Sequence, residues 1–161
     1  MKHLIKGYWL TLSLLLLSSL PSHANQNRYT VEDILALPEA PSGVIFEIVT
    51  GDKMALDWVL PVLNQHISQL RARFPKLAVA VVTHGREQFA LQTEEQTNNQ
   101  EVHQLTKQMI NDGINVHVCG THAQWRGLSD EDFPEHINVS ASGPAQVNDY
   151  LGLGYLLVKI E

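Results

Sequence analysis

Residues 114–122 read INVHVCGTH, and this stretch decides how the rest of the chain is interpreted. The apolar Ile114, Val116 and Val118 alternate with more polar residues, a pattern that predicts a strand with one buried face. His117 and Cys119 share the other face, so their side chains are expected on the same side of a sheet.

The residues after this strand predict a sharp turn and then a short helix. Gly120 allows the turn, Thr121 is a suitable N-cap for a helix over residues 122–126, and Gly127 ends it. Free N–H groups at a helix N-terminus favour an anion, so the sulfur of Cys119 would be held there as a thiolate, which is the reactive form of cysteine. The alternative is that Cys119 is a small buried hydrophobic residue.

Apolar segments alternate with amphipathic segments on both sides of this stretch. This alternation predicts an α/β fold, with a parallel sheet covered by helices on both faces. Such sheets bind ligands at the carboxyl ends of their strands, where Cys119 and His84 fall. The expected strands are residues 43–50, 77–83, 114–119, 137–141 and 155–160, and the expected long helices are residues 52–74, 99–112 and 144–151.

The N-terminal residues predict export. A basic start with Lys2 and Lys6, an apolar run over residues 8–20 and a small-x-small site ending at Ala24 are typical of a signal peptide cleaved after Ala24. We therefore expect a periplasmic protein in a cell with two membranes, with no membrane contact after cleavage; an uncleaved N-terminal anchor is the alternative. The expected domains are residues 1–24 as the signal peptide, 25–41 as an N-terminal lead-in and 42–161 as one folded domain.

Charge and cysteine content exclude several classes of function. The formal net charge is −6 at pH 7, and the sequence contains no cluster of basic residues. This argues against binding to nucleic acid and against electrostatic binding to an anionic membrane surface. A single cysteine rules out an intramolecular disulfide, and in an exported protein it indicates a free reactive thiol or an intermolecular bond. No glycine-rich nucleotide motif follows the first strand, so no cofactor is expected.

Four short motifs resemble the DsrE/DsrF-like family of sulfur-relay proteins. The resemblance covers most of residues 43–161, with the cysteine at the end of the third strand and a terminal Gly-Tyr as its most specific features. The matching segments are residues 81–85 (VVTHG), 116–120 (VHVCG), 139–143 (VSASG) and 154–157 (GYLL).

The resemblance implies a three-layer α/β/α fold with a five-stranded parallel sheet, and a homo-oligomer that is a trimer or a hexamer. It also implies that Cys119 carries sulfane sulfur as a persulfide between a sulfur donor and an acceptor thiol or protein. In that role His84 or His122 would assist the thiol, Arg126 would steer an anionic sulfur compound, and Trp125 would wall the pocket. The helix start after the strand predicts that the backbone amides of Gly120 to His122 face the sulfur.

Two other functions are compatible with the same residues. His117, Cys119 and His122, with His84 as a further candidate, offer imidazole and thiolate ligands that suit copper or zinc, so a metal-binding periplasmic module is the first alternative. The second is a non-catalytic subunit of an oligomeric assembly, in which Cys119 is inert.

Overall fold

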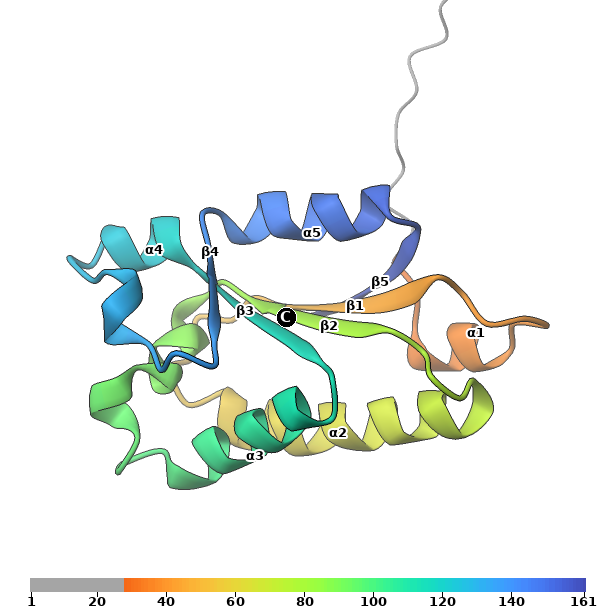
Figure 1. Cartoon of the computed structure of the whole chain (residues 1–161), viewed down its shortest axis with the longest axis horizontal. Helices are drawn as coiled ribbons and strands as arrows, with labels where there is room; N and C mark the ends of the chain where they lie inside the picture. Colours follow the sequence, from red (N-terminus) through yellow and green to blue (C-terminus); the bar gives the residue numbers. More distant parts are fainter. Residues whose placement is uncertain (1–27) are drawn as a thin grey trace, which may run out of the picture.

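Five parallel strands form the centre of the molecule, in the order β4-β3-β2-β1-β5 (Figure 1). The structure is a computed structural model and describes residues 28–161. Each strand lies within a range that the sequence predicted, which confirms the expected parallel sheet. The strands are β1 (Gly43–Ile48), β2 (Val79–Thr83), β3 (Asn115–Cys119), β4 (Asn138–Ser140) and β5 (Tyr155–Ile160).

Helices cover both faces of this sheet and give the three-layer α/β/α fold. Figure 1 shows α1, α2 and α3 on one face and α5 on the other, while α4 follows β3 at the carboxyl edge. The α-helices are α1 (Val31–Leu35), α2 (Leu56–Arg73), α3 (Gln100–Asn111), α4 (Gly120–Gln124) and α5 (Gly143–Gly152), and the short 3-10 helices are η1 (Arg86–Leu91), η2 (Thr93–Glu95) and η3 (Asp130–Asp132).

The alternation along each strand divides the core into two unequal parts. The larger part, between the sheet and α1–α3, contains Val116 and Val118 of β3, as the sequence predicted. The smaller part lies under α5 and contains strand residues Ile45, Ala80, Val82 and Leu157 together with helix residues Val147 and Tyr150. Because successive side chains of a strand point to opposite faces, His117 and Cys119 lie on the α5 side.

A chain of hydrogen bonds joins β3 to α5 where this smaller core ends. The hydroxyl of Ser140 donates to Oε1 of Gln146 at 3.0 Å, so Ser140 accepts from Nδ1–H of His117 at 2.9 Å. Nε2 of His117 then accepts from the hydroxyl of Tyr150 at 2.9 Å. Burial lowers the pKa of His117 and raises the pKa of Tyr150. Both side chains are therefore neutral in this series of hydrogen bonds.

The described part of the lead-in contains α1, which is stabilised by a capping box at its N-terminus. Thr30 accepts from the backbone N–H of Asp33, and the Asp33 side chain accepts from the N–H of Thr30. Val31 and Ile34 are buried against the body of the protein. No helix within residues 28–161 is long and apolar enough to cross a membrane, and the expected signal peptide lies outside the described residues.

Candidate functional site

A pocket opens at the carboxyl edge of the sheet, where the loops after β1, β2 and β3 meet the start of α5. Its volume is about 420 Å³. The pairing of β2 with β3 places Thr83 opposite Val118, so His84 leaves the sheet level with Cys119. The structure therefore brings His84, Cys119 and His122 to one pocket. Ser142 and Pro144 line this pocket on the α5 side.

The thiol of Cys119 lies in the wall of this pocket. Only 5% of the residue is exposed, and its backbone N–H donates to Oε1 of the buried Gln88 at 2.7 Å. Its sulfur accepts a hydrogen bond from the backbone N–H of His122 at 3.5 Å. A donor of this kind stabilises a thiolate more than a neutral thiol, because the acceptor then carries a charge.

The turn after β3 differs from the expected one. The sequence predicted Thr121 as the N-cap, but α4 begins at Gly120 and Cys119 itself is the N-cap residue. Thr121 gives its backbone N–H, at 3.1 Å, and its hydroxyl, at 2.6 Å, to the carbonyl oxygen of Ala141. The expectation that the amide of Thr121 faces the sulfur is therefore wrong, and Thr121 fastens the loop after β3 to the loop after β4.

His122 is fixed by contacts on both sides of its ring. Nδ1–H donates to the carbonyl oxygen of His84 at 2.9 Å, and the ring packs edge-on against Phe89 with 4.9 Å between centroids. In the neutral ring this arrangement leaves the lone pair on Nε2. His122 thus presents a proton acceptor within the pocket that contains Cys119.

His84 is paired with a carboxylate that comes from the next strand. Its Nε2–H donates to Oε1 of Glu47 at 2.8 Å, and both side chains are largely covered. The hydrogen bond from His84 holds the pKa of the Glu47 carboxyl below its ordinary value, against the opposing effect of burial. A carboxylate on one ring nitrogen orients the imidazole, as in nucleophilic sites where a third group positions the base.

A second, fully buried carboxylate holds the loops that form the pocket. Oε2 of Glu87 accepts from the backbone N–H and the hydroxyl of Thr50, and Oε1 accepts from the hydroxyl of Thr83 and the N–H of Gly85. Gly85 must be glycine because a Cβ there would lie 2.4 Å from the carbonyl oxygen of Thr50. The loops after β1 and β2 are thereby joined through one side chain.

Aromatic and basic residues lie at the rim of the pocket. Trp125 belongs to the lining and is 79% exposed. Arg126 lies outside the lining, because its guanidinium stacks on Phe89 at 4.5 Å from the ring centroid. The basic residue in the lining is Arg86, so the structure offers Arg86 in the steering role that the sequence gave to Arg126.

The proposed metal ligands are not brought together. Both ring nitrogens of His117 are engaged, by Ser140 and by Tyr150, whereas Cys119 and His122 face the pocket. Within residues 28–161 no group of three or more His, Cys, Asp or Glu side chains is arranged to hold a metal ion. His117 therefore serves the docking of α5 and is lost to the metal-binding alternative, while His84, Cys119 and His122 share the pocket.

Three residues of the site escaped the sequence reasoning, namely Glu47, Arg86 and Gln88. Glu47 did carry a signal, since it is the one charged residue in the apolar run over residues 43–50 (GVIFEIVT). A charge in a buried strand needs a partner, and His84 directly follows β2, the strand next to it. Gln88 carried no such signal, because its bond to Cys119 joins segments that are far apart in the sequence.

Solved structures confirm the fold. A protein of unknown function, MTH1491 from Methanobacterium thermoautotrophicum, matches with a TM-score of 0.57 and 16% identity, over 73% of this chain and 97% of that chain. The ychN protein from E. coli matches with a TM-score of 0.53 and 14% identity, over 73% of this chain and 99% of that chain. BT1422 from Bacteroides thetaiotaomicron, a conserved protein of unknown function, matches with a TM-score of 0.52 and 14% identity, over 74% and 95% of the two chains. No curated protein matches the chain.

A family model connects these features. The model of the DsrE/DsrF-like family matches residues 51–160. The matched span contains β2, β3, β4 and β5, and with them His84, Cys119 and His122 of the pocket. The resemblance seen in the short sequence motifs is thereby confirmed over most of the described residues, and the chain belongs to the DsrE/DsrF-like family.

Proposed function

We propose that this protein carries sulfane sulfur as a persulfide on Cys119. One observation carries the proposal: the sulfur of Cys119 lies in the wall of a pocket that His84 also lines, and it accepts a hydrogen bond from the N–H of His122, while His84 is bonded to Glu47. Membership of a family of sulfur-relay proteins supports the same chemistry at a coarser level.

The proposed transfer proceeds through two displacements at sulfur. The Cys119 thiolate attacks the outer sulfur of a donor such as thiosulfate, so that a new S–S bond forms while the bond to sulfite breaks and its electron pair leaves with sulfite. An acceptor thiolate then attacks the outer sulfur of the persulfide, and the Cys119 thiolate leaves. The sulfur atom moves without net oxidation or reduction, so the steps need no external oxidant or reductant.

The surrounding residues have distinct parts in this proposal. The N–H of His122 stabilises the anionic sulfur before attack and after release. The His84 imidazole, oriented by Glu47, takes the thiol proton and returns it, and Nε2 of His122 is the second candidate for that step. Arg86 lies in the lining where an anionic donor would enter.

The wider setting follows from the family and from the N-terminal sequence. Members of the family are sulfur-relay proteins that work in complexes, so a protein partner is expected in general. We propose that the partner supplies or accepts the sulfur and that the chain itself assembles as a trimer or hexamer. We also propose that the protein acts in the periplasm after cleavage behind Ala24; N-terminal sequencing of the exported protein should then begin at Asn25.

Intact-mass measurement tests the central proposal. The native protein, incubated with thiosulfate or polysulfide, should gain the mass of one or more sulfur atoms, and added thiol should remove it. The Cys119→Ser variant should gain none. His84→Ala and His122→Ala should slow the gain, whereas His136→Ala, which alters a histidine outside this pocket, should not. A native thiol that gains no sulfur and reacts only after unfolding would refute the proposal and leave the assembly subunit as the better alternative.

A further inference from the structure

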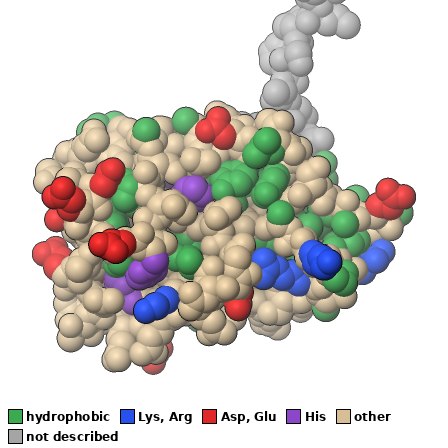
Figure 2. Space-filling view, in the orientation of Figure 1, with side chains coloured by type: hydrophobic (Ala, Val, Ile, Leu, Met, Phe, Trp, Pro, Cys, Tyr) green, Lys and Arg blue, Asp and Glu red, His purple; other side chains and the backbone are tan. Residues whose placement is uncertain are grey.

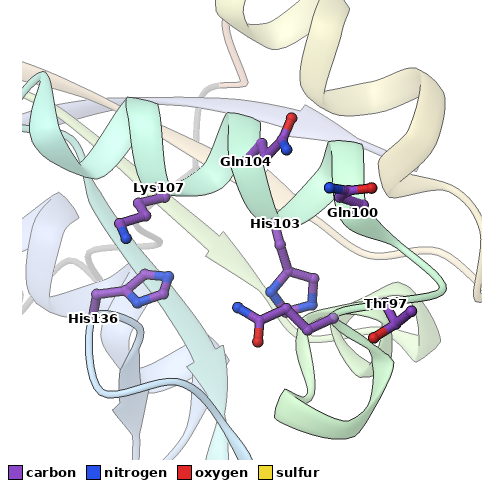
Figure 3. A pocket seen from close by; sticks show the side chains of 7 residues that line it. Thr97, Gln100, His103, Gln104, Lys107 and His136 are labelled. Carbon is purple, nitrogen blue, oxygen red and sulfur yellow. The ribbon is translucent and has the colours of Figure 1, made fainter.

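A second pocket lies on the α3 side of the sheet, away from Cys119. It has a volume of about 390 Å³ and is bounded by α3, the segment after η2 and the loop before β4. Figure 2 shows histidine side chains beside a basic side chain on one face of the molecule, and Figure 3 shows the pocket from close by. The residues that line it are Gln96, Thr97, Gln100, His103, Gln104, Lys107 and His136.

The most informative residue in this pocket is His103. It is only 5% exposed, and its Nε2–H donates to the carbonyl oxygen of Ala90 at 3.0 Å. In the neutral ring the lone pair is then on Nδ1, and Nδ1 is buried without a hydrogen-bond partner. Buried polar atoms are nearly always paired. The unpaired Nδ1 of His103 therefore indicates that a hydrogen-bond donor from outside the protein can bind beside this ring.

A second imidazole of the same pocket also has a nitrogen without a hydrogen-bond partner. Nε2 of His136 is also buried without a partner. Figure 3 shows the side chain of His136 next to the end of Lys107, with His103 on the other side of the pocket. The two imidazoles with an unpaired nitrogen and the ammonium group of Lys107 therefore belong to side chains that line one pocket.

Burial is the main reason that both imidazoles stay neutral, and nearby positive groups add to its effect. Burial lowers the pKa of His103 most, and His136 adds to this effect, while the carbonyl groups of Ala90 and Gln92 and the carboxylate of Glu95 oppose it. Burial and the charge of Lys107 lower the pKa of His136. Glu95, on η2, is already engaged by Lys53 and by nearby asparagines. The lone pairs of both rings are thus available at neutral pH.

We propose that this pocket binds a small hydroxylated anion, with its acidic group on Lys107 and its hydroxyl groups donating to Nδ1 of His103 and Nε2 of His136. Carboxamide side chains complete the lining, and they match hydroxyl groups because they both donate and accept. The lining contains one ammonium group and no carboxylate, which favours one negative charge on the ligand and disfavours a cation. The volume exceeds what a bare ion fills and lies in the range of small-molecule sites.

Binding of defined probes tests the proposal independently of Cys119. D-Gluconate and D-glucose 6-phosphate present the two sources of negative charge, carboxylate and phosphate, on a hydroxylated chain. D-Glucose lacks the charge and inorganic phosphate lacks the hydroxylated chain. The imidazole ¹⁵N signals of His103 and His136 should shift as at least one of the first two probes is titrated into the full-length protein, and glucose and phosphate should bind at least about tenfold more weakly.

Two variants connect the binding to the named groups. Lys107→Gln should weaken the charged probe roughly tenfold or more, because a charge-assisted hydrogen bond is lost. His136→Phe keeps a ring without a lone pair and should also weaken it, with unchanged far-UV circular dichroism to show that the protein is folded. Lys76→Gln removes one exposed positive charge before β2 and should leave affinity unchanged.

Three results would overturn the proposal. The first is the absence of any shift of the His103 and His136 signals with either charged probe at millimolar concentration. The second is an affinity that Lys107→Gln leaves unchanged, and the third is binding of phosphate as tight as that of gluconate and glucose 6-phosphate.

Discussion

Replacing Glu87 by glutamine should destabilise the protein far more than an ordinary loss of charge. The carboxylate is fully buried and accepts four hydrogen bonds, from the N–H and hydroxyl of Thr50, the hydroxyl of Thr83 and the N–H of Gly85. Each carboxylate oxygen faces one backbone N–H, at 2.8 Å in both cases. In either orientation of the glutamine amide, its NH₂ group must therefore face a backbone N–H.

The magnitude follows from these contacts. The two hydroxyl groups can rotate and adapt to an NH₂ group, but a backbone N–H cannot. An unpaired buried donor costs about 1–3 kcal/mol, and the bonds that remain lose the strengthening that a charged acceptor gives. We expect a loss of about 2–4 kcal/mol in the free energy of unfolding, a large part of the roughly 5–15 kcal/mol that stabilises a typical domain.

Urea unfolding followed by circular dichroism measures this loss, with an unchanged m-value as the sign that the native state is comparable. Glu39→Gln, an exposed residue before β1, is the matched control and should stay within about 0.5 kcal/mol of the native protein. Thr83→Val, which removes one of the donors, should lie between the two. If Glu87→Gln proves as stable as Glu39→Gln, the argument that this carboxylate joins the loops after β1 and β2 is refuted.

Three further predictions concern pH, the docking of α5 and assembly. The pKa of Glu47 is lowered from 4.5 mainly by the hydrogen bond from His84. The Glu47–His84 pair therefore stabilises the protein above pH 4.5, and this stabilisation is lost as pH falls through the lower pKa that Glu47 has in the folded protein. Glu47→Gln should therefore flatten the acid part of a curve of unfolding free energy against pH. His117→Phe should cost about 1–3 kcal/mol at pH 8, because the O–H of Tyr150 loses the acceptor to which it donates. The cost should be less at pH 5.5, because burial lowers the pKa of His117 from 6.5 and the native protein loses stability as pH falls below that value. Light scattering should show a trimer or hexamer, and a monomer at micromolar concentration would contradict this prediction. If an oligomer is found, Trp58, which is 53% exposed on α2, is the first residue to mutate in a search for the interface.

The sequence was sufficient for the fold because its signals were local. Near-apolar strands, capped helices and glycine stops define each element within a few residues, and alternation in β3 predicted which side chains enter the larger core. The same pattern placed His117 and Cys119 on one face, and the parallel sheet placed His84 and Cys119 at one edge. These are properties of residues two apart on a strand or at the ends of neighbouring strands.

The sequence could not supply the partners of those side chains. The bond between His84 and Glu47 depends on which strands are neighbours, and the bond from Cys119 to Gln88 depends on the path of a 3-10 helix. The N-cap was misplaced for a related reason, since a cysteine is a weak acceptor and Thr121 was the stronger local candidate. In the structure, the Thr121 hydroxyl instead donates a hydrogen bond to the carbonyl oxygen of Ala141.

Helix α5 connects the stability of the fold with the shape of the thiol pocket. Its first residue, Gly143, lies so close to the sheet that a Cβ there would be 2.5 Å from the Cβ of His84. Its neighbours Ser142 and Pro144 line the pocket, and the far part of the helix is held by the Tyr150–His117 bond over a small apolar core. A change that lifts α5 therefore moves one wall of the pocket and removes the packing of Gly143 against the His84 side chain at the same time. For this reason substitutions of His117 should alter the reactivity of Cys119 even though His117 does not line the pocket.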